Sequence, residues 1–120
     1  MPQSLLLISR SSPWSGLGAR EVLDIALAGG AFDLPISLLF LDDAVLQLRT
    51  EQQASALQQK DLQANLKALP MFGIEQLYAC GHSLQQRAIN PNNLCLEVQV
   101  LDEIELRTLI DQHDQVITFS

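Results

Sequence analysis

Basic residues are scarce in this chain. Its 120 residues hold 7 Lys and Arg against 14 Asp and Glu, which gives a formal net charge of −7 at pH 7. A protein that binds nucleic acid on its own needs a basic surface to meet the phosphate backbone. The basic residues are also scattered along the sequence, so the composition argues against direct binding of nucleic acid.

Long hydrophobic runs and cysteines are also few. No segment approaches the roughly 20 apolar residues of a membrane-spanning helix, and residues 1–8 lack the basic start and cleavage site of a signal peptide. We therefore expect a cytoplasmic protein with no membrane contact. Because the cytoplasm is reducing, we expect no lasting disulfide between Cys80 and Cys95, the two cysteines of the chain.

Aromatic residues make up only 5% of the chain, but hydrophobic residues together make up 48%. That share of apolar side chains is typical of a folded protein and excludes a disordered tail. A length of 120 residues is usual for one domain and allows a sizeable core. We predict a single domain, residues 1–120, without internal linkers or repeats.

Strand-like and helix-like segments alternate along the sequence. Short apolar runs predict strands at 4–9, 35–41, 73–80, 94–100 and 115–119. Helical patterns lie between them at 19–28, 56–69, 84–87 and 102–110. This alternation predicts an α/β fold, namely a flavodoxin-like, doubly wound, mostly parallel five-stranded sheet with helices on both faces.

Turn and capping residues set the expected ends of these elements. Gly29-Gly30 and Pro70 are predicted to stop the first two long helices. Asp102 is a typical N-cap for the last helix, whose inward face would include Ile110. Apolar and polar residues alternate over 94–100, which is typical of a strand near the edge of a sheet.

Cys80 ends a predicted strand, and Gly81-His82-Ser83 separates it from the helix-forming run 84–87. In an open α/β sheet, ligands and chemistry collect just beyond the carboxyl ends of the strands. A thiol there faces the N-terminus of the next helix, whose free N–H groups favour a negative charge and so the nucleophilic thiolate. Cys80 is therefore a candidate nucleophile, although a cysteine after a strand is also often a small buried hydrophobe.

His82 and Cys95 are the other residues that bear on thiol chemistry. His82 lies two residues after Cys80 and, as an imidazolium, would stabilise its thiolate. The simpler interpretation is a solvated histidine at a helix N-terminus. Cys95 falls on the polar face of the predicted edge strand, where we expect no functional role.

Asp42-Asp43 comes after the second predicted strand and is similar to the acidic pair of a phosphoacceptor receiver domain. Such a domain also places an Asp after its third strand and a Lys after its fifth. Here the third strand ends in Cys80, and the fifth carries no Lys. A receiver domain with its metal site is therefore excluded, and helix capping by Asp42 or Asp43 is the better explanation.

Two patterns come near to a phosphate site. A cysteine phosphatase loop places Arg after Cys and five intervening residues, whereas Arg87 comes after Cys80 and six. The hydroxyls of residues 9–12 could meet a flavin phosphate, but the loop lacks the Thr-Gly-Asn-Thr character of flavodoxins. Hydroxyl-rich turns are common in any βα unit. We expect no cofactor and no metal ion.

Strings spread over the whole chain carry a family likeness. They are REVLDIALA (20–28), FLDDAVLQL (40–48), KALPMFGIEQLYAC (67–80), CGHSLQQR (80–87) and DQHDQVI (111–117). In this order they resemble the DsrE/DsrF-like sulfur-relay family, and within it the TusC/DsrF branch.

The resemblance implies a subunit of a larger assembly. Proteins of this type join two small relatives, a TusB/DsrH-like and a TusD/DsrE-like chain, in a heterohexamer of two heterotrimers. The assembly receives persulfide sulfur from one carrier protein and passes it to another. In one branch the sulfur serves 2-thiolation of the wobble uridine of tRNA, and in the other it serves sulfur oxidation.

The resemblance also bears on the role of Cys80. The sulfur-carrying cysteine is usually assigned to the TusD/DsrE-like chain at the equivalent position, with Ala-rich residues and then Arg-Arg-Gly after it. This chain has Gly81-His82-Ser83 and Gln86-Arg87-Ala88 instead. Two hypotheses are open. The chain is an accessory interaction subunit without catalysis of its own, or it is a sulfurtransferase with Cys80 as persulfide carrier and His82 as thiolate stabiliser.

Overall fold

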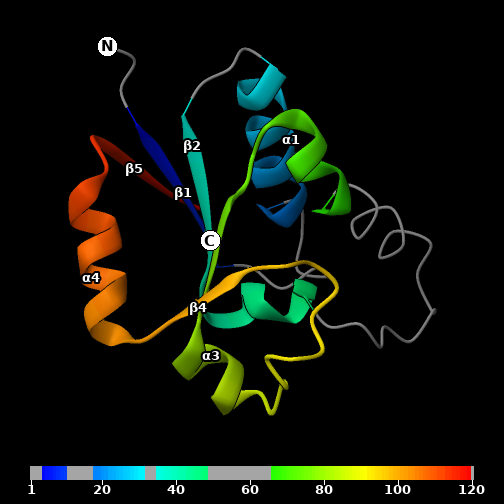
Figure 1. Cartoon of the computed structure of the whole chain (residues 1–120), viewed down its shortest axis with the longest axis vertical. Helices are drawn as coiled ribbons and strands as arrows, with labels where there is room; N and C mark the ends of the chain where they lie inside the picture. Colours follow the sequence, from blue (N-terminus) through cyan, green and yellow to red (C-terminus); the bar gives the residue numbers. More distant parts are fainter. Residues whose placement is uncertain (1–3, 11–17, 32–34, 49–65, 120) are drawn as a thin grey trace.

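Five parallel strands form one sheet at the centre of the molecule, with the order β4-β3-β2-β1-β5. The computed structural model describes residues 4–10, 18–31, 35–48 and 66–119 (Figure 1). The strands are β1 (Leu5–Ser9), β2 (Ile36–Phe40), β3 (Gln76–Cys80), β4 (Gln99–Leu101) and β5 (Gln115–Phe119). The predicted five-stranded parallel α/β fold is confirmed, and all of its strand pairs are parallel.

Helical elements cover both faces of this sheet. They are α1 (Gly18–Ala31), η1 (Asp42–Leu48), η2 (Leu69–Phe72), α3 (Gly81–Gln86) and α4 (Glu103–Gln112). Figure 1 shows α1 and η2 on one side of the sheet and α4 on the other. Of the helix predicted over 56–69, residues 66–68 are helical, and residues 56–65 lie outside the described part. None of the described helices combines the length and the apolar character that crossing a membrane requires.

The core lies in two layers, because the central strands are apolar on both faces. All five residues of β2 are buried, and so are four of the five in β1. One layer joins Leu7 and Leu38 to Leu23 of α1 and to the 3-10 helices. The smaller layer joins Leu109 of α4 to sheet residues on the opposite face, which are Leu6, Ile8, Leu39 and Leu101. Burial on both faces is what continuous apolar strands predict.

Two predicted helix ends, at Gly29-Gly30 and at Pro70, were wrong. Gly29-Gly30 lies inside α1, which continues to Ala31. A Cβ atom on Gly30 would lie 2.4 Å from the carbonyl oxygen of Phe72, so glycine here allows α1 and η2 to approach closely. Pro70 sits in the first turn of η2 and does not end the helical segment, which closes at Gly73 with φ of 86°.

The fourth strand is shorter than predicted but occupies the expected edge. β4 pairs only with β3 and covers Gln99–Leu101. The backbone N–H of Cys95 donates to the carbonyl of Leu48 at 2.8 Å, which holds the preceding segment against η1. Leu96 is buried in the core there, 8% exposed. The apolar residues of this segment therefore pack without joining the sheet.

α4 begins as predicted, with Asp102 as its N-cap. The Asp102 carboxylate accepts from the N–H of Glu105, and the Glu105 carboxylate accepts from the N–H of Asp102, which completes a capping box. Leu109 faces the sheet, 6% exposed, but Ile110 is 38% exposed, so its predicted inward position was wrong.

His113 ties the end of α4 to the sheet. Its Nδ1 lies 2.8 Å from the carbonyl oxygen of Leu109, and its Nε2 lies 2.9 Å from Oγ of Ser37. A carbonyl oxygen can only accept, so Nδ1 carries a proton, and in the neutral ring Nε2 accepts from the Ser37 hydroxyl. Ser37 is buried on β2, 7% exposed. The imidazole thus provides this buried hydroxyl with a hydrogen-bond partner.

Replacing His113 should therefore destabilise the fold. His113→Ala is expected to lower the free energy of unfolding by about 1–2 kcal/mol, because it breaks two hydrogen bonds, one to a buried hydroxyl. Urea denaturation measures the change. The control is His82→Ala, since His82 is exposed and its side chain has no hydrogen bond in the described residues. Equal stability of the two variants would show that the imidazole bridge contributes nothing.

Candidate functional site at the Cys80 end of the sheet

Cys80 is the last residue of β3 and the N-cap of α3, so it lies at the carboxyl end of the sheet as predicted. α3 begins at Gly81, directly after it, and not at the later run 84–87. The Cys80 Sγ accepts a hydrogen bond from the backbone N–H of Ser83 at 3.4 Å. The thiol therefore takes the place that a Ser or Asp side chain fills at most helix starts.

The thiol is nearly covered. Cys80 is 5% exposed, and it lies on the sheet face that carries Tyr78 and α4, since alternate residues of a strand share a face. Reactive cysteines are usually partly exposed, whereas buried ones are inert. Cys80 thus combines the position of a reactive thiol with the burial of a structural one.

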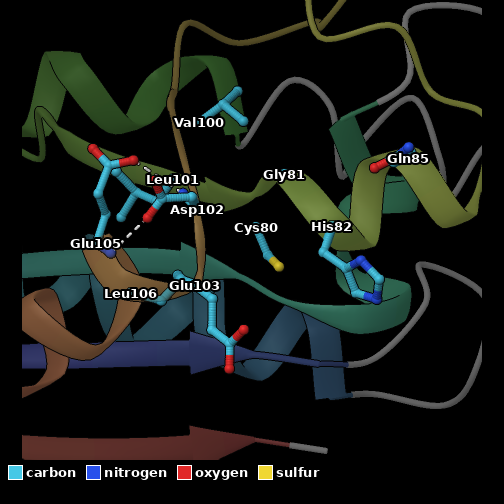
Figure 2. A pocket seen from close by; sticks show the side chains of 10 residues that line it. All are labelled: Cys80, Gly81, His82, Gln85, Val100, Leu101, Asp102, Glu103, Glu105 and Leu106. Carbon is cyan, nitrogen blue, oxygen red and sulfur yellow. Dashed lines mark hydrogen bonds between the residues drawn. The ribbon is translucent and has the colours of Figure 1, made fainter.

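His82 does not contact the thiol in this structure. It is exposed, and no hydrogen bond joins it to Cys80 among the described residues. Figure 2 shows its imidazole extending away from the Cys80 sulfur. Its role as thiolate stabiliser stays a prediction.

A cavity of 710 Å³ opens beside Cys80, between α3 and the start of α4 (Figure 2). One wall comes from Cys80, Gly81, His82 and Gln85. The other comes from Val100–Glu103, Glu105 and Leu106. Its size is in the usual range of ligand-binding cavities. The two walls meet because Cys80 and Leu101 are register partners at the ends of adjacent strands.

Gly81 allows this junction to form. A Cβ atom there would lie 3.1 Å from Cγ1 of Val100 and 3.3 Å from the carbonyl oxygen of Leu101. Both distances are tighter than ordinary contacts, so glycine lets the start of α3 pack against β4.

Asp42 and Asp43 each form an ion pair with an arginine, and both also connect to α3. The Arg10 Nε donates to Asp42 at 2.8 Å, and the Arg87 Nη2 donates to Asp43 at 2.8 Å. Asp42 has a left-handed backbone, φ 54°, and its N–H donates to Oγ of Ser83 at 3.0 Å. The pair thus connects the ends of β1 and β2 to α3. Among the described residues, no three His, Cys, Asp or Glu side chains gather where they could hold a metal ion.

The comparison with known families agrees with this architecture. The DsrE/DsrF-like family matches residues 3–119. The chain belongs to the DsrE/DsrF-like family.

Individual relatives match over nearly the full length. The protein TusC homolog of Pseudomonas aeruginosa is 61% identical over 118 residues, which are 98% of this chain and 99% of that protein. The protein TusC homolog of Vibrio vulnificus (strain CMCP6) is 34% identical over 115 residues, 96% of this chain and 98% of that one. The expected likeness to the TusC branch of the DsrE/DsrF-like family is confirmed.

A solved structure shares the fold. The crystal structure of the ychN protein from E. coli superposes with a TM-score of 0.76 and covers 98% of this chain and 99% of its own. Its sequence identity is 20%, so the likeness shows the fold of the DsrE/DsrF-like chain and nothing finer.

Sequence reasoning located Cys80 but missed most of its surroundings. The acidic wall from α4 was not anticipated, although the predicted edge position of β4 carries a signal: an edge strand next to β3 would bring Asp102 near Cys80. The hydrogen bond between the Asp42 N–H and the Ser83 hydroxyl could not be predicted from the sequence, because the two residues are 41 positions apart in the chain. Arg87, a near miss for a phosphate loop, pairs with Asp43.

Loss of the Ser83 hydroxyl should loosen α3. Ser83 is 3% exposed, and Ser83→Ala would leave the Asp42 N–H without this acceptor, which should cost about 1–2 kcal/mol of unfolding free energy. Alkylation of Cys80 by iodoacetamide should also accelerate, because the helix that covers it opens more often. Gln86→Ala, on the exposed side of the same helix, is the control. An unchanged alkylation rate in Ser83→Ala would show that the hydrogen bond between Ser83 and Asp42 does not restrain α3.

Cys95 should react only at high pH. Burial raises the pKa of the Cys95 thiol, although the charge of Lys67 and a backbone hydrogen bond oppose the rise in part. In a Cys80→Ala variant, the pH at half-maximal alkylation should exceed the value of about 8.5 of a free cysteine. Because the folded-state pKa is raised, the Cys95 thiol loses its proton at lower pH in the unfolded chain than in the folded one. The free energy of unfolding should therefore fall as pH rises above the unfolded-state pKa, and this thiol should have no effect on it below that pKa. Half-maximal alkylation at or below the free value would refute this.

Proposed function

We propose that the chain is an interaction subunit of a sulfur relay, which holds partner proteins together and does not itself carry sulfur. The observation that carries this proposal is the burial of Cys80, which is 5% exposed and serves as a helix cap. A sulfur carrier must bring its sulfur into contact with a donor and then an acceptor, which a covered thiol does not do. Membership of the DsrE/DsrF-like family supports the relay itself.

The relatives named TusC homolog support a finer proposal. The chain assembles with a TusB/DsrH-like and a TusD/DsrE-like subunit into a heterohexamer in the cytoplasm. That assembly passes persulfide sulfur between carrier proteins toward 2-thiolation of the tRNA wobble uridine. Identity of 61% to one such homolog over almost the whole length favours this branch over sulfur oxidation.

Exposed apolar side chains are consistent with such an assembly. Ile104 is 75% exposed on α4, and Val116 and Ile117 are 38% and 42% exposed on the edge strand β5. Single exposed apolar residues are ordinary, whereas contiguous exposed apolar patches are typical of interaction surfaces. We expect partner subunits to cover part of them.

The alternative hypothesis is a thiol-active sulfurtransferase. The Cys80 thiolate would attack the outer sulfur of a donor persulfide, form a Cys80 persulfide and release the donor's thiolate, with no net oxidation. The Ser83 N–H that donates to the Cys80 Sγ and the adjacent cavity favour this chemistry. His82 would then assist the thiolate, and Cys80 would have to become more exposed during transfer.

Two measurements decide between these hypotheses. The isolated chain, treated with a persulfide donor, is expected to gain no sulfur atom by intact mass. Expressed together with the two small related chains, it is expected to co-purify with both at the mass of a heterohexamer. Cys95→Ala serves as control for sulfur on the other thiol. A gain of one sulfur that disappears in Cys80→Ala would support the carrier hypothesis and overturn ours.

The pathway has its own test. Cells that lack the chain are expected to lose 2-thiouridine from tRNA, measured by mass spectrometry of digested nucleosides. Normal 2-thiouridine together with impaired sulfur oxidation would assign the chain to the other branch.

A further inference from the structure

β5 is the longer and more open of the two edge strands of the sheet. It pairs with β1 in unbroken register over all five of its residues, and β1 is its one neighbour among the described strands (Figure 1). Residues 115–118 are exposed, and Phe119 is partly buried. The opposite edge strand, β4, has three residues. An additional strand therefore finds its longest pairing edge along β5.

Alternate residues of β5 direct their backbone groups away from the sheet. Hydrogen bonds at the two ends of the β1–β5 pair involve the Gln115 N–H (3.0 Å) and the Phe119 carbonyl (2.9 Å). In a parallel ladder, every second residue of a strand bonds to the same neighbour through both its N–H and its C=O. The odd-numbered residues of β5 therefore bond to β1, whereas Val116 and Thr118 point their N–H and C=O groups outward. Within the described part of the chain, no backbone group bonds to these outward groups.

β5 has none of the features by which edge strands usually avoid pairing. Its sequence, QVITF, has no charged residue and no proline, and its register with β1 contains no bulge. Val116 and Ile117 are 38% and 42% exposed, although β-branched side chains stabilise strands by packing against a neighbouring strand. A chain with a net charge of −7 thus presents an uncharged strand at this edge.

We propose that β5 pairs with β5 of a second copy of the chain, antiparallel and about a two-fold axis at Ile117. In this register Val116 lies opposite Thr118 of the other copy, so every outward N–H meets an outward C=O. Ile117 lies opposite its own counterpart. A shift by one residue would set outward groups opposite inward ones, so the pairing has one preferred register.

A second copy is the occupant that these observations favour. A contact between identical surfaces must be self-complementary, and it closes the assembly at two chains. β5 meets this requirement in its backbone groups and in its apolar centre, and no like charges oppose each other across the axis because the strand is uncharged. The pairing joins two five-stranded sheets and removes an open edge from each. The inference goes beyond the proposed function, since it needs no related subunit.

Sedimentation of the isolated full-length chain tests the proposal. One pair of five-residue strands buries less surface than a permanent dimer interface, so we expect a shift from one chain to two as concentration rises. Hydrogen exchange, measured by NMR, should then slow at the amides of Val116 and Thr118, whereas the Ile117 amide is already bonded to β1. A chain that stays monomeric would overturn the proposal. So would protection of these two amides only after a related subunit is added.

Ile117 tests the register, because it lies on the proposed axis. Ile117→Lys and Ile117→Glu each place two like charges opposite each other, and each alone is expected to weaken dimerisation at least about tenfold. An equimolar mixture of the two variants should dimerise again, because the mixed pair has opposite charges. Ile104→Lys, at an exposed isoleucine of α4, is the matched control and should dimerise like the wild-type chain. Unchanged dimerisation in Ile117→Lys, a mixture that stays monomeric, or an equal loss in the control would each contradict the pairing.

Thr118→Pro separates loss of pairing from loss of folding. The Thr118 N–H points outward, so proline removes a hydrogen bond to the second copy and none to β1, which edge strands tolerate. This variant is expected to keep the circular dichroism of the wild-type chain and to lose the dimer. A folded Thr118→Pro chain that still dimerises would refute pairing along β5.

Discussion

Burial of the central strands on both faces is the constraint on which the rest of the structure depends. β1 and β2 carry almost no polar side chains, so the chain must place helices on both sides of them. Parallel pairing then brings the carboxyl ends of all five strands to one edge of the sheet. Cys80, Asp42 and Asp102 meet near this edge although they are far apart in sequence. The site is therefore a consequence of the sheet, and its details depend on the turn after each strand.

The turns after β2 and β3 are joined in a clamp. Asp42 and Asp43 bind Arg10 and Arg87, and Ser83 links the same turn to α3. Exposed ion pairs contribute little stability on their own, but here a buried hydroxyl and a left-handed Asp backbone belong to the same network. Arg87 pairs with Asp43 and is not among the residues that line the Cys80 cavity, where the charged side chains are the carboxylates at the start of α4.

The sequence predicted the elements better than their junctions. Continuous apolar runs identified β1 and β2, and Asp102 identified the start of α4, because these signals are local. Gly30 was wrongly predicted to end a helix, because glycine is required there by the close approach of the Phe72 carbonyl oxygen, and Phe72 is distant in sequence. Residues 94–98 alternate like a strand, yet Cys95 bonds to Leu48 and Leu96 turns into the core. For the same reason Cys80 could be located from sequence, but the hydrogen bond that joins Ser83 to Asp42 could not.

The burial of Cys80 and the charge around it both bear on the proposal that the chain is an interaction subunit that carries no sulfur. A relay carrier must expose its sulfur and tolerate negative charge there, because thiolates and persulfide anions are the reacting forms. In this chain Cys80 is 5% exposed, and three carboxylates line the cavity beside it. The end of β3 thus keeps a cysteine in the position of a nucleophile, buried beside an acidic cavity.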